Sequence, residues 1–98
     1  MTDAELLNKV KAALGITGNY QDATLQVYID EVRGFMTGAG VPLEIVTSAA
    51  SVGCISRGVS DLWNYGSGNG KLSPYFLQRM LQLAATEAPA TGGGSNGG

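Results

Sequence analysis

Apolar residues recur at helical spacing in four separate segments of this chain. The longest run extends from residue 22 to about 39, and its apolar positions stand three or four residues apart: Leu25, Tyr28, Ile29, Val32, Phe35, Met36 and Ala39. This spacing places them on one face of a helix. Similar patterns predict helices over residues 2–14, from between 42 and 48 to 65, and over 74–85. The sequence therefore predicts an all-α fold, a compact bundle of about four helices.

Several helix ends can be placed from residues that satisfy or interrupt backbone hydrogen bonds. Thr2 and Glu5 have the spacing of a capping box, and Gly15 suits the left-handed stop that follows a helix. The ring of Pro42 prevents simple continuation of the second helix. Ser73 predicts the start of the last helix, because a serine caps free backbone N–H groups and the proline that follows needs no hydrogen bond there.

The predicted core consists of apolar residues that share the inward faces of these helices: Leu6, Val10, Leu25, Ile29, Val32, Met36, Val52, Val59, Leu62, Trp63, Phe76 and Met80. Trp63 stands in the middle of the third apolar stripe and is expected to be buried. Gly53 and Gly58 in the same helix are each unfavourable by roughly 1 kcal/mol relative to alanine. We therefore expect another helix to pack closely against these small residues.

Four further side chains do not fit helices with a single buried face. On the helical wheel Cys54 lies opposite the core arc, near Tyr65, where solvent is expected. Val27 and Tyr75 show the same misfit on the second and last helices. Covering by a neighbouring molecule would explain all four, with a lightly exposed structural cysteine as the alternative for Cys54. These positions are the predicted subunit or partner interface.

The composition changes at the end of the last predicted helix. Residues 1–85 form the predicted helical domain, whereas 86–98 contain proline, alanine, threonine and then a run of glycines. Such a segment buries too little side chain to offset its chain entropy, so it is expected to be flexible alone. Thr86, Glu87 and Pro89 are expected to become ordered against a partner.

Low charge indicates that much of this small surface is covered. Charged residues are 14% of the chain and apolar residues 44%, and the net charge is −2. The six basic residues form no stripe of the kind that binds a phosphate backbone, which disfavours sequence-reading of nucleic acid. No apolar run approaches the ~20 residues of a membrane span, and no signal peptide is evident. We therefore expect a soluble interaction module with no membrane partner.

The sequence offers little catalytic or metal-binding chemistry. It has no histidine and one cysteine, so a Ser-His-Asp triad, a Cys-His pair and a thiolate-imidazole zinc site are missing. Asp61 stands four residues after Arg57, which predicts an ion pair. The glycine-rich segment 66–71 lacks the P-loop spacing and is expected to be a helix–helix turn, in which Lys71 is a candidate for channel or loop contact with DNA. We expect a non-enzyme with no cofactor or metal.

The order of elements resembles the small head–tail connector, or head-completion adaptor, proteins of tailed bacteriophages. The resemblance covers residues 2 to about 84 and is carried by four segments: LLNKVKAAL (6–14), DATLQVYIDEVR (22–33), SRGVSDLWNY (56–65) and LSPYFLQRML (72–81). The family has no active-site signature, and the glycine-rich end of this chain is atypical of it.

The resemblance implies a ring, commonly of twelve copies, that docks beneath the portal protein after DNA packaging. Such a ring extends the DNA channel, contacts channel DNA non-specifically and presents a surface to the next tail or head-closure protein. The expected location is the neck of the virion, after synthesis in the cytoplasm of the bacterial host. The alternative is a small helical nucleic-acid-binding regulator, because a helix-turn-helix can occur in a compact all-α chain.

Overall fold

The computed structural model describes residues 1–64 and 72–86, and within these ranges it contains helices and no strands. The helices are listed here in chain order: α1 (Asp3–Leu14), α2 (Asp22–Gly38), α3 (Leu43–Val46), the 3₁₀ helix η1 (Ala49–Ser51), α4 (Val52–Asn64) and α5 (Pro74–Thr86). The predicted all-α fold is confirmed. The last helix includes Thr86 and so extends one residue past the predicted end.

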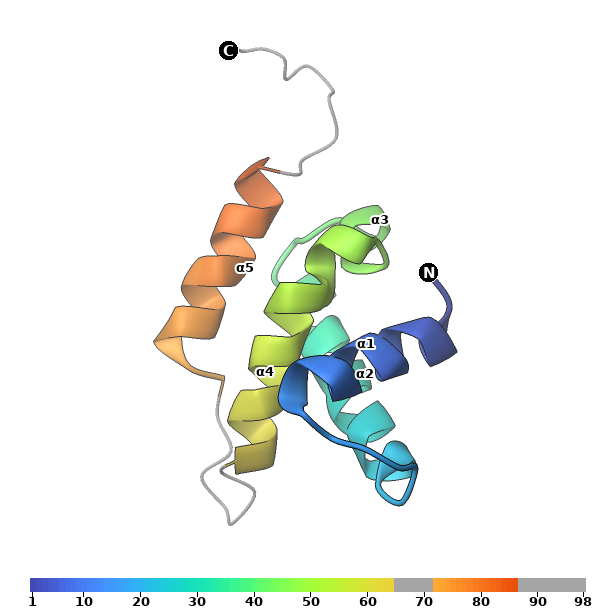
Figure 1. The fold of residues 1–98 in the computed structure, drawn as a ribbon. Coiled ribbons are helices and arrows are strands. Elements are labelled where there is room, and N and C mark those ends of the chain that lie inside the picture. Colours follow the sequence, from blue (N-terminus) through green and yellow to red (C-terminus); the bar gives the residue numbers. More distant parts are fainter. Residues whose placement is uncertain (65–71, 87–98) are drawn as a thin grey trace.

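Helix α4 lies at the centre of the arrangement. It packs against α1, α2 and α5, and Figure 1 shows it between α5 on one side and α1 and α2 on the other. Ile55 and Val59 are fully buried on α4, and so is Cys54 at 2% exposure. Because α4 has neighbours on both sides, two of its faces are buried. The sequence analysis had assumed one buried face.

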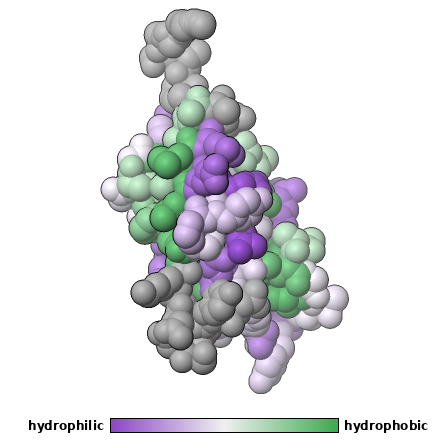
Figure 2. Space-filling model, turned by 90° about the vertical axis from the view of Figure 1, so that its left-hand side faces the viewer, coloured by the Kyte–Doolittle hydropathy of each residue, from purple (hydrophilic) through white to green (hydrophobic). Residues whose placement is uncertain are grey.

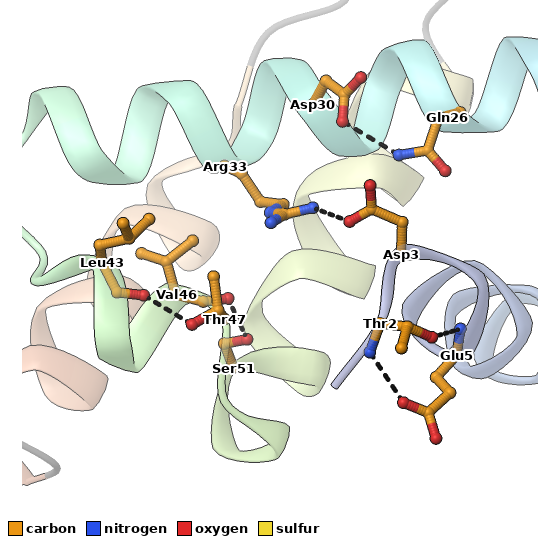
Figure 3. A network of polar contacts seen from close by, with 10 residues as sticks. All are labelled: Thr2, Asp3, Glu5, Gln26, Asp30, Arg33, Leu43, Val46, Thr47 and Ser51. Carbon is orange, nitrogen blue, oxygen red and sulfur yellow. Dashed lines mark hydrogen bonds and ion pairs between the residues drawn. The ribbon is translucent and has the colours of Figure 1, made fainter.

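The predicted ends of α1 and the predicted cap of α5 are confirmed. The Thr2 hydroxyl accepts a hydrogen bond from the Glu5 N–H (3.1 Å), and the Glu5 carboxylate accepts one from the Thr2 N–H (2.7 Å) (Figure 3). The bond from Thr2 lowers the pKa of the Glu5 carboxyl below its ordinary value. Gly15 has the left-handed φ of 72° that a C-terminal stop requires. The Ser73 hydroxyl accepts from the Phe76 N–H (3.1 Å), as a cap of α5 should.

The prediction of one continuous third helix is wrong. The structure divides this segment into α3, η1 and α4, with extended backbone at Ser48 (ψ 162°) between α3 and η1. The Ser51 hydroxyl donates to the carbonyls of Val46 and Ser48, both at 2.8 Å. Side-chain hydrogen bonds of this kind compete with helical backbone bonds. They fix a bend that apolar spacing alone does not reveal.

Ten of the twelve predicted core residues are buried, and two are corrected. Val52 and Trp63 are only partly buried and pack against the core from its edge. Trp63 meets Tyr28 edge to face, with ring centroids 5.9 Å apart. Among the described aromatic residues, Phe76, which was also predicted, is fully buried. Trp63 stands one residue before the end of α4.

Gly58 allows the close approach of helices that the sequence predicted. A Cβ atom at this position would lie 2.8 Å from Cγ1 of Val32 and 2.9 Å from Cε1 of Phe76. Both side chains are fully buried, so neither has free space into which to move. Gly58 therefore marks the point where α2, α4 and α5 converge.

Candidate functional site: the exposed faces of helices α2 and α5

Tyr75 at the start of α5 is exposed between two arginines. The residue is 52% exposed, and the guanidinium carbons of Arg57 and Arg79 lie 5.1 and 6.0 Å from the centroid of its ring. Cations at such distances are attracted by the face of an aromatic ring. The structure thus keeps Tyr75 at the surface, as predicted, and fixes the orientation of its ring. The predicted role of Tyr75 in an interface remains a prediction.

The charge of Arg57 is matched by Asp61, as the spacing predicted. Nη2 of Arg57 lies 3.1 Å from Oδ1 of Asp61, whose side chain is only 2% exposed. The other oxygen, Oδ2, accepts hydrogen bonds from the N–H (2.9 Å) and the hydroxyl (2.7 Å) of Ser73. Burial of this carboxylate is therefore compensated by three donors. Sequence analysis found the ion pair and missed the link to α5.

Arg79 borders a pocket between α4 and α5. The pocket has a volume of about 410 Å³ and is lined by Ala50, Cys54, Arg79, Gln82 and Leu83. Among the described residues, Arg79 has no carboxylate partner; its guanidinium lies over the backbone of Gly53 and near the ring of Tyr75. A positive charge therefore stands at the rim of a partly apolar hollow.

The prediction that Cys54 lies on the surface is wrong. It is 2% exposed and packs in the core on the side of α4 that faces α5. Burial raises the pKa of its thiol to about 11, against which the nearby Arg79 acts weakly in the opposite direction. Cys54 is therefore a protonated core residue at neutral pH and leaves the list of candidate interface residues.

The outward face of α2 carries an exposed apolar residue beside acidic ones. Val27 is 62% exposed, in agreement with the predicted misfit. Asp30 and Glu31 follow it by three and four residues and are also exposed, so they border it on the helix surface. Asp30 accepts a hydrogen bond from Gln26 (3.0 Å), as Figure 3 shows, whereas Glu31 has no ion pair within the described ranges. Gly34 has open space around it.

Two further apolar side chains are exposed, one on α2 and one on α5, and neither is among the predicted interface residues. Phe35 of α2 is 42% exposed and its ring lies 6.0 Å from that of buried Phe76. Leu81 of α5 is 65% exposed, and Leu77 one turn earlier is partly buried. Figure 2, which looks onto the α5 side, shows hydrophobic surface next to a hydrophilic band. Helical spacing places Phe35 in the apolar run of residues 22–39, so its exposure is not evident from the sequence.

Two ion pairs tie α2 to α1 and involve no predicted site residue. Arg33 and Asp3 are joined at 3.1 Å across the start of α1 (Figure 3), and Lys11 and Asp22 at 2.7 Å. A shallow hollow of about 330 Å³ lies beside the first pair and is bordered by Leu43, which is 65% exposed. These contacts orient α1 on the bundle.

Several predicted site residues cannot be placed. Tyr65, Lys71, Glu87 and Pro89 lie outside the described residues, and Thr86 is known as the last residue of α5. In the part that the structure describes, no three His, Cys, Asp or Glu side chains are grouped so as to hold a metal ion. No helix in the described ranges is both long and apolar enough to cross a membrane.

Comparisons with known proteins found no relative. No protein-family model, curated protein or solved structure matches the chain.

Proposed function

We propose that the chain is a structural subunit of the head–tail connector of a tailed bacteriophage. In this proposal it forms a ring, of about twelve copies by the family resemblance, beneath the portal protein. The ring extends the DNA channel and receives the next tail or head-closure protein. It is located at the neck of the virion, where it has a structural role in assembly and no catalytic activity.

One observation carries this proposal: a small helical domain exposes apolar side chains on two different helices. Val27 is 62% and Tyr75 52% exposed. A ring is built from heterologous contacts, in which one face of a subunit meets a different face of the next. A single patch would serve a pair of subunits, whereas two distinct faces serve a closed ring. The exposed side chains of α2 and α5 meet this requirement.

The low positive charge of the described surface also supports the proposal. Arg57 is paired with buried Asp61, Lys11 with Asp22 and Arg33 with Asp3. DNA must slide through a connector, so a channel that holds phosphates strongly would retard its passage. A regulator that binds duplex DNA needs more unpaired cations than Lys9 and Arg79 provide in this part of the chain. Salt-dependent affinity for duplex DNA would favour that alternative.

The proposal is tested by interrupting the coding sequence in a phage that carries it. We expect DNA-filled heads and free tails to accumulate, and supply of the chain from a plasmid to restore whole particles. A stop codon placed after residue 86 tests the tail, which we propose contacts the portal or a neighbouring ring protein. Normal yields of infectious particles without the chain would contradict the proposed function.

A further inference from the structure

Two pairs of surface residues on different helices match each other in spacing and in charge, three of the four being exposed and Arg79 partly buried. On α2, exposed Val27 is followed four residues later by Glu31. On α5, exposed Tyr75 is followed four residues later by Arg79. Residues four apart on a helix are neighbours on one face, with Cβ atoms about 5–6 Å apart. Each helix thus presents an apolar side chain and, one turn further along, a charged side chain. The charge is negative on α2 and positive on α5.

The charged member of each pair is available to a partner. Arg79 has no carboxylate partner and Glu31 no cation within residues 1–64 and 72–86. Arg79 is partly exposed at the rim of the pocket that Ala50 and Leu83 also line, and its Nη2 lies over the backbone of Gly53. Gly34 follows Glu31 by three residues on α2 and has no side chain, and no atom lies within 4 Å of its Cβ position. A second helix can therefore approach the outward face of α2 closely at this point.

We infer that α2 of one copy docks on α5 of the next, with Val27 against the ring of Tyr75 and Glu31 paired with Arg79. The occupant of each face is a second copy of this chain, because every copy carries both complementary halves. A different partner that is complementary to the pair on α2 would leave the pair on α5 uncovered, and the reverse holds for a partner of α5. The inference rests on the proposed ring and names its subunit contact.

In the proposed ring this contact is heterologous. The face on α2 meets one neighbour and the face on α5 meets another, so each copy keeps one face free after the first contact. Such contacts continue until a ring closes or a filament grows. Opposite charges at the contact fix its register, because a shift by one turn would place Glu31 on Tyr75 and leave Arg79 unpaired.

The test exchanges the two charges in the full-length chain and measures its mass by sedimentation velocity over a range of protein concentrations. We expect wild type to self-associate beyond a dimer. Glu31→Arg and Arg79→Glu should each weaken self-association by roughly tenfold or more, because like charges then meet. The double variant E31R/R79E, and a mixture of the two single variants, should regain it. Matched controls are Glu44→Arg and Lys9→Glu, which alter exposed charges away from both faces and should leave self-association unchanged.

Circular dichroism establishes that each variant is folded, and Arg79→Gln replaces R79E if the glutamate variant is not. Failure of the double variant to regain self-association would overturn the pairing, as would a wild-type chain that stays monomeric at every concentration. An equal loss of self-association in E44R and K9E would indicate a general effect of charge and would also overturn the pairing of Glu31 with Arg79. Failure of the charge exchange overturns this subunit contact alone, whereas the proposed function is tested separately, by whether infectious particles assemble without the chain.

Discussion

Asp61 of α4 holds Ser73, the residue that caps α5. Its Oδ2 accepts both the N–H and the hydroxyl of Ser73, at 2.9 and 2.7 Å, while the same hydroxyl accepts from the N–H of Phe76. A buried carboxylate on one helix therefore determines where the next helix begins. Arg57 closes the arrangement from the surface side.

Asp61→Ala should destabilise the fold by about 1–3 kcal/mol, since both donors of Ser73 lose their acceptor. The larger loss expected on breaking a fully buried ion pair does not apply, because the side chain of Arg57 is 42% exposed and water can solvate it. Urea unfolding measures the change. Asp30→Ala removes an exposed carboxylate and should change stability by about 0.5 kcal/mol or less. Equal effects of the two substitutions would contradict the assigned role of Asp61.

Gly58→Ala and Gly34→Ala should act in opposite directions. Alanine favours a helix by roughly 1 kcal/mol over glycine, and at Gly34 nothing lies within 4 Å of the added methyl group. At Gly58 the methyl would meet Val32 and Phe76 at 2.8–2.9 Å, and overpacking of this kind costs about 1–3 kcal/mol. We expect a higher melting temperature for G34A and a lower one for G58A. A stabilised G58A would show that α2 and α5 do not converge there.

Phe76→Ala should destabilise the chain by about 3–5 kcal/mol, because the ring is fully buried. Trp63→Ala should have a smaller effect, since the indole lies at the edge of the core and its recorded ring contact is with Tyr28. Tyr20→Ala, at a residue that is 93% exposed, is the control and should be close to neutral. Chemical unfolding of the three variants gives the order. A larger loss for W63A than for F76A would reverse the assignment.

Cys54 should make stability fall at high pH. Its thiol pKa is raised from 9.0 to about 11 in the folded chain, so between these values the unfolded chain loses the proton and the folded chain keeps it. The free energy of unfolding then decreases as pH rises through this window. Other groups titrate there too, so the quantity to measure is the difference between wild type and Cys54→Ala. That difference should be steady below pH 9 and shift in favour of C54A above it; a constant difference throughout would contradict the burial of Cys54.

Helix positions and most of the core follow from apolar spacing, because burial on one face leaves a period that can be read directly. Apolar spacing does not predict burial correctly where a helix has two buried faces. Cys54 was assigned to the surface since the wheel of α4 carried no sign that α5 packs there. Gly58 and Asp61, four and seven residues after Cys54, lie on the same side of α4. A glycine and a carboxylate on one side of a helix, with a serine cap later in the chain, are the sequence signal for this second buried face.

The candidate site was less accessible to sequence analysis. Val27 and Tyr75 were found, because an apolar side chain on a polar face is visible in the pattern. The half-exposed Phe35 was not, nor was Arg79, which has no carboxylate partner in the described part of the chain, since exposure and pairing depend on how α2, α4 and α5 meet. The break between α3 and η1 depends on hydroxyl bonds of Ser51 that spacing does not encode.

The central claim, a ring subunit at the head–tail junction, is tested most directly by locating the chain in purified virions. Electron cryomicroscopy of the neck, combined with mass spectrometry of the particles, makes this measurement. The account predicts a ring of density directly below the portal into which α1, α2, α4 and α5 fit as rigid helices, with α2 of one copy next to α5 of another. A neck built wholly from other chains, with this chain missing from the particles, would contradict it.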